Sequence, residues 1–221
     1  MNLKKEVAEY VIKYVNDGDV VGLGTGSTCV YFIKKLAEKI RKEKLDILAV
    51  PTSYQAFFLA KDEGIQVTTL DEHDIDIAVD GADAINPNLD IIKGGGASHT
   101  LEKIIDYSAD KFYVIADNSK YVDSLDVCPV PIEIIPISLR YVTDILKDLG
   151  ADSVIRMGKL KQGPVITDNG NFIIDVKFKN ISNPSKLEEE LNHIPGVIEN
   201  GLFTRNVSEV FIGTKDGVKK L

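Results

Sequence analysis

Cysteine is scarce in this sequence of 221 residues, which contains only Cys29 and Cys128. The two do not form a Cys-x-x-Cys motif, and no histidine cluster accompanies them. The sequence therefore predicts neither a disulfide framework nor a zinc site, and we expect two reduced, buried thiols. The three histidines, His73, His99 and His193, lack the spacing of metal ligands, so we expect them at exposed positions or in polar networks.

Long apolar runs are also missing. No segment offers the roughly 18 uninterrupted apolar residues that a membrane-spanning helix needs. Residues 1–6 lead directly into a charged helical pattern, without the apolar core of a signal peptide. We therefore expect a cytoplasmic protein that has no membrane partner.

Positive charge is in deficit, because 26 lysines and arginines stand against 34 aspartates and glutamates, for a net charge of -8. This balance argues against a broad basic surface of the kind that binds nucleic acid nonspecifically. A small anion is still possible, since backbone amides and one or two lysines can form a local positive pocket.

Short apolar runs alternate with helical patterns over the first 127 residues. Because 44% of the residues are hydrophobic, the chain can bury a substantial core. The expected helices cover residues 7–15, 28–40, 54–61 and 98–107, and the expected strands cover 20–23, 47–50, 66–70, 75–79 and 112–116. This order predicts an α/β fold in which helices cover both faces of a parallel sheet.

The pattern changes after about residue 127, where prolines flank an apolar segment. Helices are expected at residues 139–149 and 185–193, strands at 153–157 and 172–176, and a hairpin turn at 168–171. Strands at 197–198 and 210–212 are expected to return the chain to the first sheet. We therefore expect one domain formed by residues 1–127 plus 199–221, and a smaller α+β domain formed by residues 128–198.

A glycine-rich segment, Gly22-Leu23-Gly24-Thr25-Gly26-Ser27-Thr28, connects an expected strand to an expected helix. We call residues 22–28 the glycine loop. Its amides and hydroxyls suit a phosphate group, and Ser27 or Thr28 can cap the helix. The dinucleotide pattern G-x-G-x-x-G would need a glycine at position 27, and the next strand ends in Pro51-Thr52-Ser53 without an acidic residue. No Walker ending follows the loop either, so the sequence favours a phosphorylated metabolite.

Two further motifs carry acid/base groups. Asp80-Gly81-Ala82-Asp83 places two carboxylates after an expected strand, where they can bind sugar hydroxyls or exchange protons with them. Lys93-Gly94-Gly95-Gly96 combines a cation with three glycines, which are expected where a ligand or another backbone comes close. Glu102 follows in the next helix. Taken alone, Glu102 has the pattern of a solvated helix-surface glutamate.

Together these segments and Ile194-Pro195-Gly196-Val197-Ile198-Glu199-Asn200-Gly201-Leu202-Phe203 resemble the ribose-5-phosphate isomerase type A family, in order and over essentially the whole chain. The resemblance implies a Rossmann-like domain with a smaller, ferredoxin-like α+β domain, assembled as a homodimer or homotetramer. It implies the interconversion of ribose 5-phosphate and ribulose 5-phosphate in the pentose phosphate pathway, without a metal or another cofactor.

The resemblance also assigns roles to single residues. Glu102 is the base that moves a proton between C1 and C2, and Asp80, Asp83 and Lys93 complete the catalytic group. The residues implied to bind substrate are Thr25, Gly26, Ser27, Thr28, Asp80, Gly81, Ala82, Asp83, Lys93, Gly94, Gly95, Gly96 and Lys120. Either aspartate can assist opening of the furanose ring.

Two other functions use the same features. An acyl-CoA transferase would form a thioester on Glu102, although hydroxyls beside paired aspartates fit a polyhydroxy phosphate better. A noncatalytic sugar-phosphate sensor would bind the same ligand, but it would normally need an output module, and the sequence shows no helix-turn-helix appendage or basic tail before residue 7.

Overall fold

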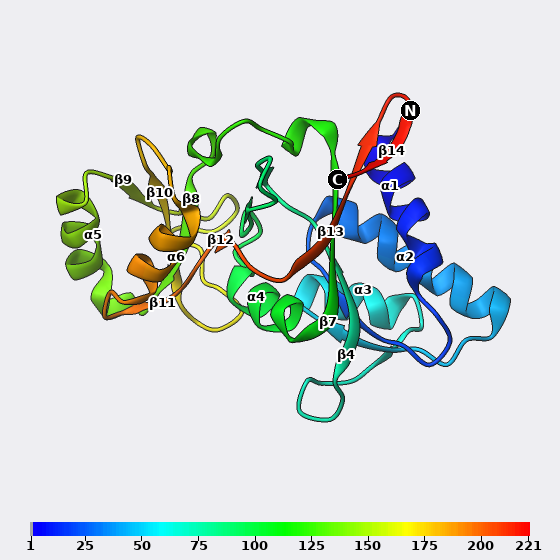
Figure 1. Cartoon of the computed structure of the whole chain (residues 1–221). Coiled ribbons are helices and arrows are strands. Elements are labelled where there is room, and N and C mark those ends of the chain that lie inside the picture. The colour runs from blue at the N-terminus through cyan, green and yellow to red at the C-terminus, as the bar shows by residue number, and fades with distance from the viewer. Residues whose placement is uncertain (1) are drawn as a thin grey trace. The chain divides into compact units, whose positions relative to one another are not determined.

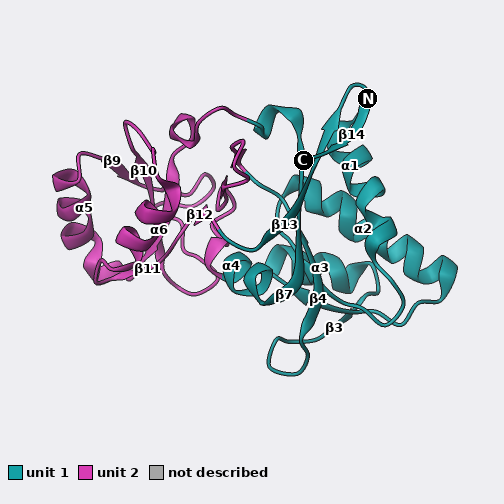
Figure 2. Ribbon diagram, viewed as in Figure 1, with its two compact units in different colours: residues 1–82, 101–121, 205–221 teal, residues 83–100, 122–204 magenta. Residues whose placement is uncertain are grey.

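A computed structural model describes residues 2–221, which divide into two compact units. The first unit contains the residues up to Ala82 together with residues 101–121 and 205–221. The second unit contains residues 83–100 and 122–204. Figure 1 shows the course of the chain, and Figure 2 colours the two units separately.

The first unit is built on a seven-stranded sheet in the order β14-β13-β7-β4-β1-β2-β3. Only the pair β13 and β14 is antiparallel, which confirms the predicted, mostly parallel sheet. The strands are β1 (Val20–Leu23), β2 (Leu48–Pro51), β3 (Gln66–Val67), β4 (Ile75–Asp80), β7 (Ala109–Asp117), β13 (Val207–Thr214) and β14 (Gly217–Lys220).

Helices cover both faces of this sheet. They are α1 (Leu3–Val11), α2 (Ser27–Glu43), α3 (Tyr54–Asp62) and α4 (His99–Ser108). Val21 belongs to the apolar core under α1 and α2, whereas its neighbour Val20 packs with Ile105 of α4. Successive residues of a strand point to opposite faces, so α4 lies on the face opposite to α1 and α2, as the α/β pattern predicts.

Most expected elements of this unit are present, but their ends differ. β3 is only two residues long, and β14 was not predicted. The prediction that Ser27 or Thr28 caps α2 is wrong, because α2 begins at Ser27 and the cap position falls on Gly26. Gly26 has φ +107°, a backbone conformation that residues with a side chain rarely adopt. No side chain caps the helix there.

The second unit contains a four-stranded antiparallel sheet in the order β11-β8-β10-β9, which confirms the expected α+β character. Its strands are β8 (Val130–Ile134), β9 (Asp152–Ile155), β10 (Phe172–Lys177) and β11 (Val197–Asn200), and its helices are α5 (Leu139–Asp148) and α6 (Pro184–Asn192). The expected turn at 168–171 is present, because Thr167 and Asn171 pair through their backbones across it. The expectation that residues 197–198 return to the first sheet is wrong, since β11 pairs with β8.

Three very short strands, β5 (Ala84–Ile85), β6 (Ile91–Ile92) and β12 (Leu202–Phe203), form a separate sheet. Two-residue strands leave no periodic pattern, so the sequence did not reveal them. Because β6 pairs with β12, residues 83–100 and 199–204 pack within the second unit, whereas the expected boundaries placed them in the first. The remaining expected boundaries, 127 and 128, lie close to the observed change at residue 122.

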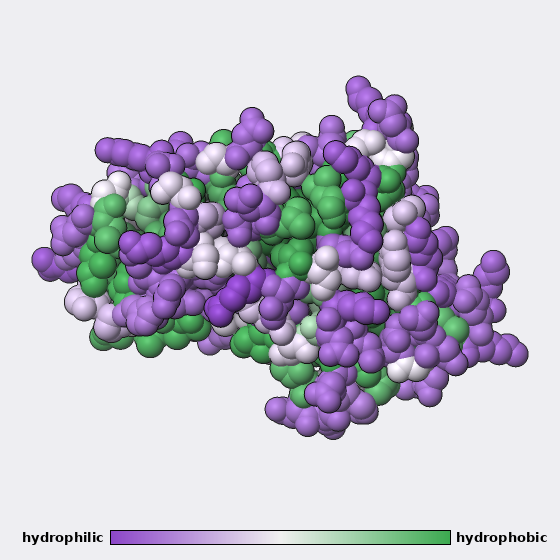
Figure 3. Space-filling model, in the orientation of Figure 1, coloured by the Kyte–Doolittle hydropathy of each residue, from purple (hydrophilic) through white to green (hydrophobic). Residues whose placement is uncertain are grey.

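Short 3₁₀ helices complete the described elements, at Ile12–Tyr14, Asn118–Lys120, Leu125–Val127 and Pro136–Ser138. The face drawn in Figure 3 is mainly hydrophilic, with apolar residues exposed in several places. Within residues 2–221, none of the helices combines the length and the apolar character needed to span a bilayer. Both cysteines are thiols as expected, but only Cys29 is fully buried.

Candidate active site

The glycine loop is fixed by a buried carboxylate. Asp80, at the end of β4, has no exposed surface, and its Oδ1 accepts hydrogen bonds from the backbone amides of Thr25 (3.0 Å) and Gly81 (2.6 Å). A Cβ on Gly24 would lie 2.2 Å from that Oδ1 atom and 2.5 Å from the Asp80 Cα. Glycine is therefore required at position 24, because the backbone of the loop passes directly against β4.

The hydroxyl of Thr25 connects the loop to the end of the second strand. Its Oγ1 lies 2.8 Å from Thr52 Oγ1 and 2.5 Å from Ser53 Oγ. The ends of β1, β2 and β4 are thus brought together at the carboxyl edge of the sheet, where ligands bind in folds of this class.

A lysine that sequence reasoning missed lies beside the loop. Lys4, in the first turn of α1, donates from Nζ to Ser27 Oγ over 2.9 Å. The sequence held a usable signal, because Lys4 lies three, four and seven residues before the buried Val7, Ala8 and Val11. These spacings place Lys4 on the packed face of the helix.

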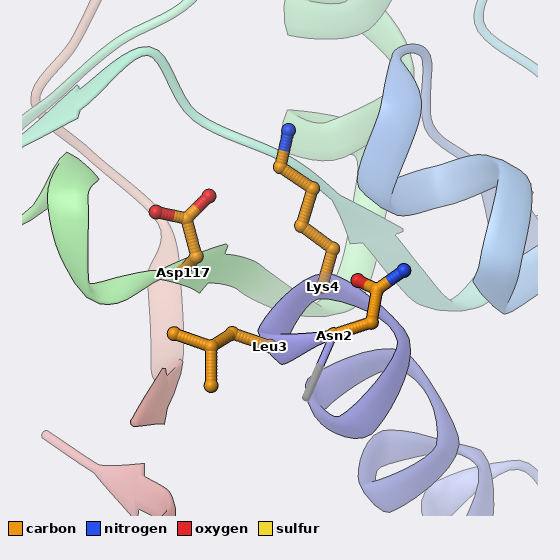
Figure 4. Close-up of a pocket in the computed structure, with 4 residues that line it drawn as sticks. All are labelled: Asn2, Leu3, Lys4 and Asp117. Carbon is orange, nitrogen blue, oxygen red and sulfur yellow. The ribbon is translucent and has the colours of Figure 1, made fainter. Parts of the chain in front are cut away.

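Lys4 also lines an open pocket of about 370 Å³ together with Asn2, Leu3 and Asp117. Figure 4 shows the Lys4 side chain extending from α1, with Asp117 projecting from the end of β7.

Asp117 links this pocket to the predicted Lys120. Burial raises the pKa of Asp117, but two hydrogen bonds from Ser119 and the charges of Lys4 and Lys120 together hold it below its usual range. Lys4 and Lys120 therefore lie close enough to Asp117 to act on the same carboxylate. The first unit thus brings two ammonium groups to this edge of the sheet.

Glu102 is not the solvated glutamate that its local pattern indicates. Only 3% of it is exposed, and it lies in the first turn of α4. Lys103 and Asp106 of the same helix are also buried. Burial of polar residues on this helix means that its apolar periodicity alone does not identify the packed face. A carboxylate withdrawn from water in this way suits proton transfer.

The second unit contributes a tight turn, residues 94–97, which we call the glycine turn. The Gly94 carbonyl accepts a hydrogen bond from the Ala97 amide (3.0 Å), and both residues have positive φ, +99° and +65°. A Cβ on Gly94 would also lie 2.6 Å from His99 Nδ1. The Gly95 amide donates to Asp83 Oδ2 over 2.7 Å, so the predicted Asp83 and the glycines are in direct contact.

Lys93 enters this turn from a buried position, with only 2% of its surface exposed. Its backbone amide donates to the Gly201 carbonyl (2.9 Å), and its ammonium lies 5.6 Å from the centre of the Phe203 ring. The segment 200–203, which is distant in sequence, therefore positions Lys93. The family motif quoted above includes that segment, although periodicity gave no reason for it.

A network of buried hydrogen bonds centres on one carboxylate, that of Glu133, and reaches the start of α4. Glu133 of β8 has no exposed surface, and it accepts hydrogen bonds from neutral groups of Thr100, Thr167, Asn169 and Asn171. Burial alone raises the pKa of Glu133, but these hydrogen bonds outweigh that effect and lower it below its usual range. The network ties β8 to the 167–171 turn and to the first turn of α4.

Over residues 2–221, the structure brings no three histidine, cysteine, aspartate or glutamate side chains into an arrangement that could hold a metal ion. His99 is buried and its Nε2 lies 3.2 Å from the Glu199 carbonyl, in line with the polar-network role expected for it.

Comparison with known proteins identifies the family of the chain. Residues 48–217 match the family model described as ribose 5-phosphate isomerase A (phosphoriboisomerase A). A ribose-5-phosphate isomerase A from Methanothermobacter thermautotrophicus is 53% identical over 221 residues, covering 100% of this chain and 98% of the relative.

Two solved structures are equally similar. The structure of ribose 5-phosphate isomerase A from Methanocaldococcus jannaschii is 52% identical with a TM-score of 0.97, covering 99% of this chain and 97% of that one. A D-ribose-5-phosphate isomerase in complex with phospho-erythronic acid is also 52% identical, with a TM-score of 0.98 and coverage of 100% and 99%. The chain therefore belongs to the ribose 5-phosphate isomerase A family.

Proposed function

We propose that this protein interconverts D-ribose 5-phosphate and D-ribulose 5-phosphate through an enediolate intermediate, with Glu102 as the proton-transferring base. The observation that carries the assignment of the base is the burial of Glu102 at the start of α4. The relatives named above support the reaction.

The phosphate end of the substrate is assigned to the glycine loop and its lysines. The loop runs into the N-terminus of α2, whose amides and helix dipole attract anions. Thr25, Gly26, Ser27 and Thr28 offer amides and hydroxyls, while the ammonium groups of Lys4 and Lys120 supply positive charge. The Lys4–Ser27 hydrogen bond supports adding Lys4 to the residues predicted from sequence.

The reacting end is assigned to Glu102, Lys93 and the glycine turn. In the direction from aldose to ketose, the Glu102 carboxylate removes the proton from C2, and the negative charge develops on O1. The protonated Glu102, which can exchange its proton with solvent, then delivers a proton to C1, while the proton of the 2-hydroxyl moves to O1. The amides of Gly94 and Gly96 and the Lys93 ammonium stabilise the enediolate.

Asp80 and Asp83 are assigned separate tasks, of which ring opening belongs to Asp83. Asp80 is completely buried and holds the glycine loop and Gly81. Asp83 is partly exposed, and its Oδ2 accepts a hydrogen bond from Gly95. Asp83 is therefore the carboxylate that exchanges protons with the ring oxygens, while Asp80 keeps the loop in place for the phosphate.

The ligand of the solved relative supports this chemistry. Phospho-erythronic acid carries a planar carboxylate with two oxygens at one end and a phosphate at the other. An enediolate is likewise planar, with negative charge shared at adjacent oxygens. We expect phospho-erythronic acid to inhibit this protein competitively with ribose 5-phosphate.

The decisive experiment is isomerisation of ribose 5-phosphate in D₂O, followed by NMR. Deuterium at C1 of ribulose 5-phosphate is expected, because the base exchanges with solvent during the enediolate's lifetime. Glu102→Gln is expected to keep substrate affinity but lower kcat by at least about 10²–10⁴-fold. Glu43→Gln, on the exposed end of α2, serves as the matched control.

Three outcomes would contradict the proposal. An unchanged kcat in Glu102→Gln would remove this residue as the base. Binding of ribose 5-phosphate without turnover by the unmodified protein would favour a sensor. A Glu102 thioester that borohydride traps after incubation with acyl-CoA would favour the transferase.

The proposal also includes the cellular setting. We propose a cytoplasmic homodimer or homotetramer that uses no metal, no other cofactor and no nucleic acid. Light scattering coupled to size-exclusion chromatography measures the assembly, and a monomer would contradict it. Activity is expected to survive EDTA, and inhibition that a divalent ion reverses would contradict the metal-free reaction.

A further inference from the structure

The carbonyl groups of the glycine turn accept hydrogen bonds from Arg156, a residue that lies outside the sequence motifs described above. Arg156 directly follows β9, and its Nη1 donates to the carbonyl oxygens of Gly94 (2.8 Å) and Gly95 (3.2 Å). Its remaining donors, Nε and Nη2, both face the carboxylate of Asp175, with Nε at 2.9 Å from Oδ2. One guanidinium group therefore joins a carboxylate to two consecutive backbone carbonyls.

The base of this side chain is firmly placed. The Arg156 amide donates to the Ile173 carbonyl and its own carbonyl accepts from the Val165 amide, both over 2.8 Å. Asp175 lies on the neighbouring strand β10. The side chain of Arg156 is 17% exposed and that of Asp175 is 29% exposed, so the pair is shielded from most solvent screening.

The contacts fix one particular peptide group. The peptide between Gly94 and Gly95 has its carbonyl on Arg156 and its amide on Asp83, 2.8 Å and 2.7 Å away. A peptide flanked by two glycines has few steric limits on its rotation, so these two partners decide its orientation. Linked hydrogen bonds polarise one another, so the guanidinium also strengthens the bond from the Gly95 amide to Asp83.

We propose that Arg156 is a positioning residue for the isomerisation: held by Asp175, its guanidinium fixes the Gly94–Gly95 peptide so that the glycine turn and Asp83 meet the sugar in a productive orientation. This inference rests on the proposed function, because it assumes that the turn and Asp83 bind the substrate. It adds to that function a support that does not itself touch the substrate.

Lysine cannot replace this group. An ammonium is a single point of charge, whereas the planar guanidinium presents donors in fixed directions to Asp175 and to the turn at the same time. Arg156→Lys keeps the charge but loses that geometry. We expect kcat/KM for ribose 5-phosphate to fall by about 10–100-fold, since misplacement of a binding group by about 1 Å has effects of that size.

The experiment compares Arg156→Lys, Asp175→Asn and the double variant in kcat, KM and Tm. Asp175→Asn is expected to lower kcat/KM by a smaller factor, and the double variant is expected to be no worse than Arg156→Lys, because both changes act through one guanidinium. Arg140→Lys is the matched control, since Arg140 lies in the same unit but is 94% exposed and pairs only loosely with Asp144, at 3.8 Å. It is expected to leave kcat/KM unchanged.

Hydrogen exchange of the amides in residues 94–97, measured by mass spectrometry, reports on the turn without any substrate. Faster exchange is expected in Arg156→Lys and unchanged exchange in Arg140→Lys. An inactive unmodified protein would overturn the proposed function, but the exchange rates would still test whether Arg156 holds the turn.

A merely structural ion pair would behave differently. Lower Tm in Arg156→Lys and Asp175→Asn, with wild-type kcat/KM below the transition and wild-type exchange in the turn, would overturn the proposal. Should Arg156→Lys fail to fold, Asp175→Asn decides the matter, because it keeps the guanidinium and removes only the charge that orients it. Wild-type kinetics in a folded Asp175→Asn would then count against the positioning role.

Discussion

The glycine loop of the first unit and the glycine turn of the second are both held by an aspartate through a backbone amide, but they need glycine for different reasons. Gly24 is required because the loop passes against the backbone of β4 at Asp80. Gly94 is required because its φ is +99° and because His99 lies next to it. Both glycines have a close neighbour, but the neighbour of Gly24 is the backbone of β4, whereas the turn at Gly94 also receives hydrogen bonds from Arg156 at its carbonyls.

The largest effect is expected at Gly24, where the backbone of the glycine loop contacts the backbone of β4. In Gly24→Ala the new Cβ would overlap the Asp80 Cα, which cannot rotate away, so the whole loop must move. We expect kcat/KM to fall by at least about 10²-fold and Tm to drop, as overpacking typically costs about 1–3 kcal/mol. Gly64→Ala is the control, because Gly64 has positive φ but open space around it. A Gly24→Ala enzyme as active as Gly64→Ala would break the contrast.

The next largest effects are expected at Asp80 and Asp83, whose substitutions should change different kinetic constants. Asp83→Asn is expected to lower isomerisation of ribose 5-phosphate by about 10²-fold, because an amide cannot exchange the ring proton. It should still incorporate deuterium into ribulose 5-phosphate, whose open chain requires no ring opening. Asp80→Asn should instead raise KM, because a neutral amide oxygen accepts the hydrogen bond of the Thr25 amide more weakly than the carboxylate does. Equal effects of both variants on kcat and KM would show that the division of tasks is wrong.

A smaller effect is expected from the lysine behind the loop. Lys4→Ala should raise KM for ribose 5-phosphate about tenfold, the loss expected for one hydrogen bond to a charged group, with little change in kcat. Lys5→Ala is a close control, because Lys5 points its ammonium to Glu9 on the solvated face, at 3.8 Å. If both variants bind substrate equally well, Lys4 does not belong to the phosphate site.

The smallest effect concerns stability at low pH. The folded-state pKa of Glu133 is lowered, so its contribution is present above the unfolded-state pKa of about 4.3 and is lost as the pH falls through the folded-state value. Glu133→Gln should lower Tm by a few degrees at pH 7, because one acceptor becomes a donor that faces other donors. The difference should shrink below about pH 4.

Glu190→Gln, an exposed glutamate that pairs with Lys186 on the same helix, is the control for that measurement. A Tm difference between Glu133→Gln and wild type that stays constant from pH 7 to pH 3 would contradict the assignment of an ionised Glu133.

The sequence predicted the alternation of strands and helices in the first unit because each element carries a periodic apolar pattern of sufficient length. It also grouped Asp83 and the glycines into one candidate site, and the structure adds a direct hydrogen bond from the Gly95 amide to Asp83. It did not predict β5, β6 and β12, whose two residues each carry no period. Because these short strands pair with one another, residues 83–100 belong to the second unit.

The supports of the site were harder to find than the site itself. Lys4, Glu133 and Arg156 act through contacts that span 23, 33 and 62 positions in the chain. Only Lys4 left a local signal, its position on the packed face of α1. Glu102 is a case in which the local sequence was misleading. Its neighbours in the sequence predict an exposed side chain, whereas its burial depends on how the whole helix α4 packs.

The chain passes from one unit to the other four times, after residues 82, 100, 121 and 204. One of these passages falls inside α4, so a single uninterrupted helix belongs to both units. Neither unit can therefore be excised with one cut, moved into another protein as a cassette or acquired by recombination at a single junction. Insertions that lengthen the protein are expected in its surface turns, and the two units must be inherited and expressed together.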